Sequence, residues 1–349
     1  MSAGTVDPAI AEAVAALGDT VAAAAAVVPV GGRTHWEVGG PPPTGTEVRA
    51  PAGVLEYDPA ELTVTVAAGT SVGDLDATLA AAGQQCPLDP RDPAATVGGV
   101  LATGLSGLRR LRYGPVRNRL LEVHLVLGDG RCVKGGGRTV KNVSGYDVAR
   151  LVVGSFGTLG VLVQVTLRCE PRAPAQAWCV VDGSGADALA RAFRPSAVLV
   201  APDATFVLLE GFPEDVATET ALVGGTAVAA GPSWPDGPHR GRISVGPARV
   251  DAVVRGLAAD GITALGEAGI GTVHVAADSV AGLAAARERA HAKGGWLLRE
   301  AGGDGFDGFG VPVPNAALAA RVKDALDPAG RCNPGRLPLT TGVAAGAAS

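Results

Sequence analysis

The sequence predicts an α+β protein whose second half is a sheet with helices on one face. Short stretches of alternating apolar and polar residues indicate strands, and Ala-rich stretches between them indicate helices. After Pro174 these follow the order strand, helix, strand, strand, helix, which is typical of an α+β sheet. The chain has 349 residues. A single domain seldom exceeds about 250–300 residues, so we expect two domains or one with a large insertion.

The first half contains a strand, turn and helix unit. Residues 63–66 alternate as a strand does, Ser71 can cap a helix, and Gly83 ends it. Residues 122–127 and 132–133 are predicted to form a hairpin around an Asp-Gly turn. Further elements are expected in this order: strands at 161–167, 178–181, 205–209, 242–245, 272–275 and 296–299, and helices near 185–194, 213–222, 248–259, 279–293 and 315–326.

Charge and cysteine content exclude several classes of protein. The formal net charge is −5, which argues against binding to duplex nucleic acid or to an anionic membrane surface. The five cysteines are widely spaced and include no CxxC pair, so we expect neither disulfides nor a zinc site, and a reducing compartment. The first 32 residues contain no Lys or Arg, and the apolar run 21–30 is too short to span a bilayer. These features predict a cytoplasmic protein with no membrane insertion.

Glycine is unusually abundant, with 51 residues gathered partly into four clusters. Glycines after an apolar run let successive backbone N–H groups point at an anion, and Arg33 could add charge to the first cluster. A plain turn explains this cluster equally well, and tight helix packing is an alternative for the second. The clusters lie at 28–40, 93–107 continuing into 112–114, 141–147 and 154–161.

The fourth cluster does not match the common nucleotide motifs. Its glycines are spaced GxxGxxG and precede a strand, whereas the Rossmann fingerprint is GxGxxG and opens a helix. The sequence also lacks the GxxxxGK[ST] motif of a P-loop. What remains is a protein whose glycine loops could surround a long ligand that contains phosphate.

The order of the motifs resembles the vanillyl-alcohol-oxidase or PCMH-type FAD-binding family. Within that family it is most similar to the E-type FAD-binding subunits of bacterial glycolate oxidase. The similarity covers residues 28–172 and 325–338, and the motifs are PVGGRTHWEVGG, AATVGGVLATGLSG, RYGPVRN, VHLVLGDGR, KNVSGYDVARLVVGSFGTLGVL and DPAGRCNPGRL. The resemblance implies a PCMH-type FAD-binding domain of two α/β subdomains over residues 1–172 and an inserted α+β cap with an antiparallel sheet over 173–312. A C-terminal helix and NPGR segment over 313–349 would return to the FAD domain.

The resemblance also implies which residues bind FAD. The first loop would hold the pyrophosphate, the second cluster would line the diphosphate and extend toward the flavin, and the later motifs would reach the flavin and the adenine end. The residues are Gly31, Gly32, Arg33, Thr34, His35, Thr96, Val97, Gly98, Gly99, Thr103, Gly104, Ser106, Gly107, Tyr113, Gly114, Tyr146, Asp147, Gly157, Thr158, Leu159, Gly160, Val161, Asn333 and Arg336.

Two departures from the family pattern change the expected chemistry. Relatives with a histidyl-linked flavin carry His directly after the paired glycines, but Arg33 stands there, so we expect noncovalent FAD. Relatives similar to D-lactate dehydrogenase hold a metal near an HGDGN-type segment. The nearest stretch here, 302–309, has no histidine, so no metal site is predicted.

Oxidation of a 2-hydroxy acid needs a base for the hydroxyl, a cation for the carboxylate and a flavin to accept hydride. Among the five histidines, His274 is our candidate base. Arg112, Arg242 and Arg336 are candidates for the carboxylate. The sequence therefore predicts an FAD-dependent oxidoreductase of the glycolate oxidase type that acts on a small 2-hydroxy acid. By resemblance, a second flavoprotein and an iron–sulfur subunit would accompany it.

Two alternatives remain open at this point. The chain could be a flavin-binding structural or electron-relay subunit with no substrate turnover of its own, which the histidine-poor cap favours. It could also be a stand-alone FAD-dependent dehydrogenase or oxidase for a different alcohol.

Overall fold

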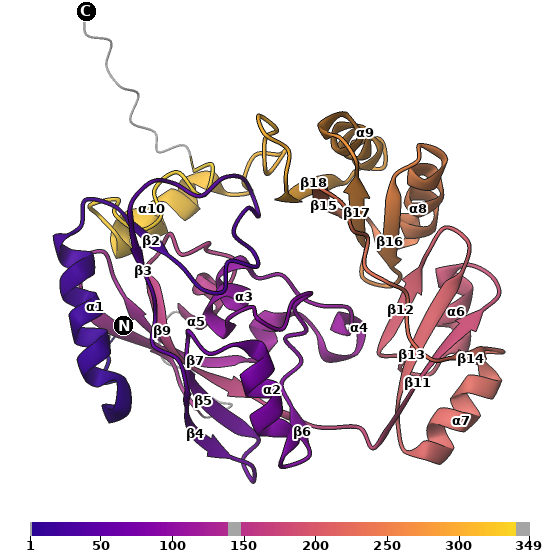
Figure 1. Cartoon of the computed structure of the whole chain (residues 1–349), viewed down its shortest axis with the longest axis horizontal. Helices are drawn as coiled ribbons and strands as arrows, with labels where there is room; N and C mark the ends of the chain where they lie inside the picture. Colours follow the sequence, from indigo (N-terminus) through magenta and orange to yellow (C-terminus); the bar gives the residue numbers. More distant parts are fainter. Residues whose placement is uncertain (1, 139–147, 340–349) are drawn as a thin grey trace, which may run out of the picture.

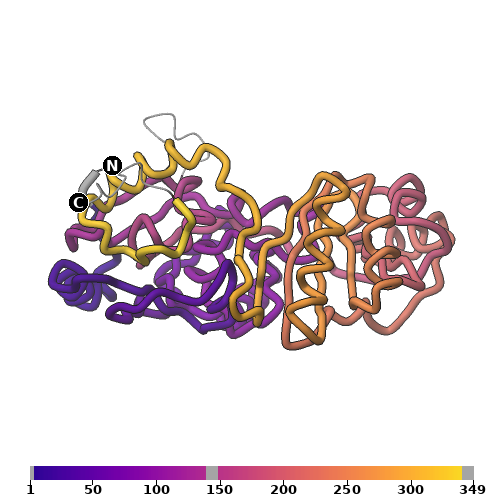
Figure 2. The backbone as a smooth tube through the Cα atoms, turned by 90° about the horizontal axis from the view of Figure 1, so that it is seen from above, coloured from indigo at the N-terminus to yellow at the C-terminus, as the bar shows by residue number. Residues whose placement is uncertain are grey.

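The computed structural model describes residues 2–138 and 148–339, which form two lobes side by side (Figures 1 and 2). The first lobe is built on a six-stranded sheet in which every neighbouring pair is antiparallel. In spatial order its strands are β1 (Ser2–Ala3), β8 (Cys132–Gly136), β7 (Leu120–Val126), β9 (Val161–Arg168), β5 (Thr63–Ala67) and β4 (Val54–Asp58).

Helices cover both faces of this sheet. On one face Leu75 and Leu101 pack with Val66 and Val165 in a single buried cluster. Helix α1 covers the other face, because its apolar stripe packs against a separate buried set that includes Val163. The helices of this lobe are η1 (Pro8–Ile10), α1 (Ala11–Ala23), α2 (Val72–Ala80), α3 (Val97–Thr103), α4 (Arg110–Tyr113), η2 (Val116–Asn118), α5 (Val148–Val152) and α10 (Ala316–Leu326).

Two short strand pairs complete the first lobe. Strand β2 (Val27–Pro29) pairs in parallel with β3 (Thr46–Val48), and β6 (Gln84–Gln85) pairs with β10 (Glu170–Pro171). The chain returns from the second lobe to β2, where Val27 forms a parallel bridge with Cys332. The segment after α10 therefore belongs to the first lobe, as Figure 2 shows for the yellow part of the tube.

The second lobe is one eight-stranded antiparallel sheet made of two βαββαβ units. The units are joined through the pairing of β12 with β16. The first consists of β11 (Ala175–Val181), α6 (Gly185–Arg191), β12 (Ala197–Val200), β13 (Thr205–Gly211), α7 (Pro213–Leu222) and β14 (Thr226–Val228). The second consists of β15 (His239–Ser244), η3 (Pro247–Arg249), α8 (Val250–Ala259), β16 (Thr263–Glu267), β17 (Thr272–Ala277), α9 (Val280–His291) and β18 (Trp296–Ala301).

Alternation along the strands gives the second sheet two different faces. Ile243, Val273 and Leu297 point to the face covered by the helices, where they share one buried cluster with Leu257 and Leu283. The helices lie on the outer side of the sheet in Figure 1. The opposite face therefore looks toward the first lobe.

The α+β class and the antiparallel sheets predicted from the sequence are confirmed. So are the helices predicted after residue 185, within a few residues at each end. The missed strands include β12, β14 and β16 of the second lobe and β2, β3 and β4 of the first. In the described ranges, no helix is both long and apolar enough to cross a lipid bilayer.

Candidate functional site

A cleft in the first lobe, which we call the glycine cleft, holds about 880 Å³ of empty space. It lies where the loop after β2 meets the ends of β3 and β5, helix α3, the start of β9 and the segment after α10. Four segments of this lining contribute glycines, among them Gly31, Gly69, Gly98 and Gly157. At these positions a ligand can approach the backbone without meeting a side chain.

The loop from Gly31 to His35 offers a row of backbone donors. Within the described chain, none of its five N–H groups donates a hydrogen bond to another residue. Arg33 adopts a left-handed conformation with φ of 58°, which lets neighbouring N–H groups turn toward one point. Such a row fits an anionic ligand, as we predicted for this loop.

Gly31 and Gly32 are required for close packing of this loop. A Cβ atom at Gly31 would overlap the hydroxyl oxygen of Thr96, and one at Gly32 would overlap the carbonyl oxygen of Ala94. The loop can therefore lie directly on the 94–96 segment only because both positions lack a side chain.

Arg33 does not offer a free charge to the cleft. Its Nη2 lies 2.6 and 2.7 Å from the two carboxylate oxygens of Glu47, and its guanidinium covers the ring of Trp36. Arg49, which sequence reasoning did not nominate, donates to the carbonyl oxygen of Gly31 at 2.8 Å. Both arginines hold the shape of the loop, and the backbone is left to meet an anion.

The opposite wall is the start of α3. Thr96 caps this helix by accepting a hydrogen bond from Gly99 N at 3.1 Å. A Cβ atom at Gly98 would lie 2.9 Å from the carbonyl oxygen of Ala68 and 3.0 Å from the Ala68 Cβ. Gly98 thus lets α3 pack against the end of β5, which supports the alternative of tight packing at this position.

Two residues after α10 close the cleft from the carboxyl-terminal side. Asn333 Nδ2 donates to the carbonyl oxygen of Phe156 at 2.6 Å, while its buried Oδ1 has no partner among the described residues. Arg336 donates to the carbonyl oxygens of Trp36, Val38 and Gly40 at 2.6–2.8 Å. Burial lowers the pKa of Arg336 to about 10, and these carbonyls satisfy its donors.

A second space, the interlobe cleft, lies between the lobes and holds about 1030 Å³ of empty space. The first lobe contributes Thr34, His35 and the segments 89–93 and 105–107, and the second contributes residues of β15, β18 and the loop before β15. Thr34 and His35 line both clefts. The two spaces therefore meet at this dipeptide.

The first-lobe side of the second sheet contributes an ion pair to this cleft. Arg242 and Glu300 lie on adjacent strands, with Arg242 Nε 3.1 Å from Glu300 Oε1. Glu300 is the extra residue of a β-bulge, since Arg240 pairs with Ala301 and Gly241 pairs with Arg299. Burial disfavours its charge, but Arg242 and other cations outweigh burial and lower the pKa of Glu300. Glu300 is therefore ionised near neutrality.

His35 is half-buried at the junction of the clefts. Burial lowers its pKa, Glu300 opposes this, and Arg242 adds to it. Its Nδ1 lies 3.4 Å from the hydroxyl oxygen of Thr103, whose proton can go to the carbonyl oxygen of Gly99 at 3.0 Å. His35 is therefore neutral near pH 7, and its Nε2 has no partner within the described chain.

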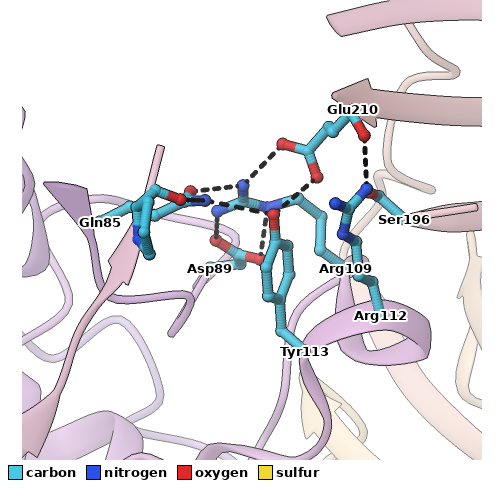
Figure 3. A network of polar contacts seen from close by, with 8 residues as sticks. Gln85, Asp89, Arg109, Arg112, Tyr113, Ser196 and Glu210 are labelled. Carbon is cyan, nitrogen blue, oxygen red and sulfur yellow. Dashed lines mark hydrogen bonds and ion pairs between the residues drawn. The ribbon is translucent and has the colours of Figure 1, made fainter. Parts of the chain in front are cut away.

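A polar network joins the lobes beside the interlobe cleft (Figure 3). Arg109 forms two hydrogen bonds with Asp89, at 2.6 and 2.9 Å, and reaches Glu210 of the second lobe at 3.1 Å. Tyr113 donates to the other carboxylate oxygen of Glu210 at 3.2 Å, and Arg112 donates to the backbone carbonyl of the same residue. This network fixes the position of the second lobe over the first.

The structure brings most of the nominated residues to the two clefts. Those on the glycine cleft are Gly31, Gly32, Arg33, Thr34, His35, Thr96, Gly98, Gly99, Thr103, Gly157, Gly160, Val161, Asn333 and Arg336. Ser106 and Gly107 lie on the interlobe cleft. Tyr146 and Asp147 fall outside the described residues. Residues that line neither cleft are Val97, Gly104, Tyr113, Gly114, Thr158 and Leu159.

His274, the candidate base, lines neither cleft. It lies on the first-lobe side of β17, directly opposite Arg242 in the sheet. Its Nε2 is 2.8 Å from Glu267 Oε1, and its ring contacts the edge of Trp234. Only 3% of His274 is exposed, so it is held beneath Trp234, away from the open cleft.

Sequence reasoning missed Phe156, Trp234 and Glu300 as lining residues. Phe156 lies within the fourth glycine cluster and has a left-handed φ of 55°. Its position between the glycines of a predicted binding loop was the sequence signal that could have identified it. Trp234 and Glu300 come from the second lobe and carry no local motif. Among residues 2–138 and 148–339, no group of three or more His, Cys, Asp or Glu side chains is placed to hold a metal ion.

Comparison with known proteins identifies the first lobe. A family model described as FAD binding domain matches residues 3–136. The chain contains an FAD binding domain. The glycine cleft fits this cofactor, because it presents the row of backbone donors at 31–35 and the unpaired Oδ1 of Asn333. The resemblance drawn from the sequence motifs is thereby confirmed.

Two relatives place this FAD binding domain more closely. Over 206 residues the chain is 36% identical to the glycolate oxidase subunit GlcE of Escherichia coli K12, which covers 56% of this chain and 59% of that protein. A D-lactate dehydrogenase of Archaeoglobus fulgidus is 42% identical over 118 residues, which covers 34% of this chain and 27% of that protein. The matches thus span about three fifths and one quarter of these relatives.

The solved structure of an alkyldihydroxyacetonephosphate synthase shares the fold across both lobes. It superimposes with a TM-score of 0.68 and covers 93% of this chain and 74% of that one, at 15% sequence identity. This likeness shows that the FAD binding domain and the second lobe together form a known architecture.

Proposed function

We propose that the protein is an FAD-dependent oxidoreductase that oxidises a small 2-hydroxy acid. One observation carries the proposal: the glycine cleft and the interlobe cleft share Thr34 and His35. A flavin held in the first cleft would therefore face a small molecule held in the second. The relatives named glycolate oxidase subunit and D-lactate dehydrogenase supply the class of substrate.

Bound FAD would supply the hydride acceptor, and the chain supplies the rest. The backbone N–H groups at 31–35 would hold the pyrophosphate, and Asn333 Oδ1 would accept a hydrogen bond from the ring system. His35 is neutral near pH 7, so its free Nε2 can take the hydroxyl proton of the substrate. We place the proton acceptor at His35 in preference to His274, because only His35 lines the clefts.

The division at residues 1–172, 173–312 and 313–349 is part of this proposal, and the second lobe is its cap. FAD would be bound noncovalently, since Arg33 takes the place of a linking histidine and is paired with Glu47. Acid precipitation checks this directly: the flavin should stay in the supernatant. Flavin that sediments with the protein would contradict it.

The decisive experiment is anaerobic mixing of the FAD-loaded chain with glycolate or D-lactate. We expect loss of the flavin absorbance band with either acid or with one of them, and much slower loss in His35→Gln. His291→Gln is the matched control, because His291 is exposed on α9. Bound FAD that neither acid reduces, with or without partner subunits, would refute the function.

The electron-relay alternative makes a different prediction in the same experiment. The GlcE relative is named as a subunit, so we propose that companion subunits, a second flavoprotein and an iron–sulfur protein, assemble with this chain. Flavin reduction only when partners are present would support the relay. A cytoplasmic location is also part of the proposal, and the five unpaired cysteines are consistent with it.

A further inference from the structure

Three arginines are candidates for holding an anionic group, and the structure distinguishes them. Arg336 donates hydrogen bonds to three backbone carbonyls of the 36–40 loop. Arg112 donates to the carbonyl oxygen of Glu210 and lies 3.5 Å from Ser196 Oγ in the network between the lobes. Neither lines the interlobe cleft, whereas Arg242 does.

Arg242 has N–H groups that no described residue accepts from. A guanidinium has five N–H groups, and within the described chain only Nε and Nη2 have acceptors, Glu300 Oε1 at 3.1 Å and the carbonyl oxygen of Ser106 at 3.1 Å. Nη1 therefore keeps both of its N–H groups for the cleft. Only 14% of the side chain is exposed, yet Nη1 is not among the buried atoms of the described residues that lack a partner, so it reaches the open space of the interlobe cleft.

The two partners of Arg242 come from different lobes and fix its direction. Ser106 belongs to the loop after α3, and Glu300 is the residue that the β-bulge adds to β18. Because both Nε and Nη2 are tied, the guanidinium cannot rotate freely, and Nη1 and the second N–H of Nη2 are held in a fixed direction. These two N–H groups are parallel, which suits the two oxygens of a carboxylate.

The remaining arginines of the cleft are less suitable. Arg91 is bonded to Asp236 at 2.9 Å, and Arg240 donates to Gly237 O at 3.2 Å and lies 3.7 Å from Asp236. Both side chains are 31% exposed, so they lie nearer the rim than Arg242. An anion bound by them would be screened by water, whereas one bound by Arg242 would be enclosed.

We propose that Arg242 is the residue that binds the carboxylate of the substrate in the interlobe cleft, with Glu300 and the Ser106 carbonyl as its positioning groups. This inference rests on the proposed function for its substrate class, a small monocarboxylate with a hydroxyl group at carbon 2. Arg242 and His35 line the same cleft, so one molecule would place its carboxylate at the first and its hydroxyl at the second.

Titration of the FAD-loaded full chain with glycolate, followed by calorimetry, tests the assignment. Arg242→Gln should weaken glycolate binding at least tenfold while FAD content stays unchanged, and Arg242→Lys should recover part of the affinity. Arg255→Gln is the matched control, because Arg255 is exposed on α8 and lines neither cleft, and it should bind glycolate within about twofold of the wild type. Equal affinity in Arg242→Gln and wild type, or an equal loss in Arg255→Gln, would overturn the proposal.

A second measurement uses the unaltered protein, in case the Arg242 variants do not fold. An arginine-selective dicarbonyl reagent is applied with and without glycolate, and peptides are mapped by mass spectrometry. Glycolate should protect Arg242 and leave Arg255 reactive; lack of protection at Arg242 would overturn the proposal. If Arg242 governs glycolate binding but no 2-hydroxy acid reduces the flavin, this inference stands and the proposed function fails.

Discussion

Replacing Gly98 with alanine distinguishes two reasons for a glycine in the glycine cleft: room for the ligand and close packing of the protein. If the position is reserved for ligand, a methyl group there disturbs only FAD. The structure points elsewhere, because the new Cβ would lie 2.9 Å from the carbonyl oxygen of Ala68 and 3.0 Å from its Cβ. That carbonyl also accepts the hydrogen bond of Gly98 N at 2.8 Å, so β5 and α3 cannot separate without weakening it.

The expected size follows from two opposing effects. Overpacking costs about 1–3 kcal/mol, whereas Gly→Ala within a helix contributes about 0.5–1 kcal/mol of stability. We expect Gly98→Ala to lower the unfolding free energy of the FAD-free protein by about 1–2 kcal/mol, and Gly98→Val to lower it further. FAD retention should fall in both because α3 is displaced.

Urea unfolding of the FAD-free protein, followed by tryptophan fluorescence, measures the effect. Gly73→Ala in α2 is the matched control, since its nearest contact is the Pro93 carbonyl oxygen at an ordinary 3.4 Å, and it should stabilise by about 0.5–1 kcal/mol. A Gly98→Ala protein that loses FAD but unfolds at the wild-type urea concentration or higher would refute the packing explanation.

Three further outcomes are expected. Glu210→Gln should lower the unfolding free energy by about 1–3 kcal/mol, because the side chain is only 4% exposed and the change removes the negative charge that pairs with Arg109. The control Glu214→Gln, at an exposed position, should change the unfolding free energy by less than about 0.5 kcal/mol. Burial and Asp89 raise the pKa of Asp76 from 3.8 to about 6, so its stabilising protonated form is lost as pH rises through that range; Asp76→Asn should therefore stabilise at pH 8, by about 1 kcal/mol after solvent screening, and not at pH 3, as urea midpoints would show. Because the pKa of His35 is lowered from 6.5, the rate of flavin reduction should rise with pH below that value and be flat above it; stopped-flow rates that keep rising to pH 8 would exclude His35 as proton acceptor.

The periodic elements of this fold were predictable because alternation and helix caps are local signals. Ser71 and Gly83 bound α2 much as the sequence indicated. Strand β12 was missed because Ala197–Val200 is buried on both faces, with Val198 and Val200 toward the helices and Ala197 and Leu199 toward the first lobe. A strand of this kind shows a continuous apolar run, which periodicity cannot separate from a helix.

The sequence predicted which loops form the glycine cleft, but it did not predict the role of each residue in them. Gly98 and Gly99 are adjacent glycines of α3. A Cβ atom at Gly98 would meet the backbone of Ala68 at the end of β5, whereas one at Gly99 would meet only the side chain of Thr96. The choice between His35 and His274 also depends on how the second lobe folds, because His274 lies under Trp234 only once the second sheet is assembled. Such contacts join residues far apart in the chain and leave no local pattern.

The return of the chain to β2 has a consequence for synthesis on the ribosome. Asn333 and Arg336 hold the Phe156 carbonyl and the 36–40 loop, so both walls of the glycine cleft depend on residues that follow the whole second lobe in the chain. A nascent first lobe can form its sheet early but cannot complete the flavin pocket until the second lobe has been translated. Cofactor capture should therefore come after translation of the second lobe, and truncation before Asn333 should yield a folded sheet with no yellow colour.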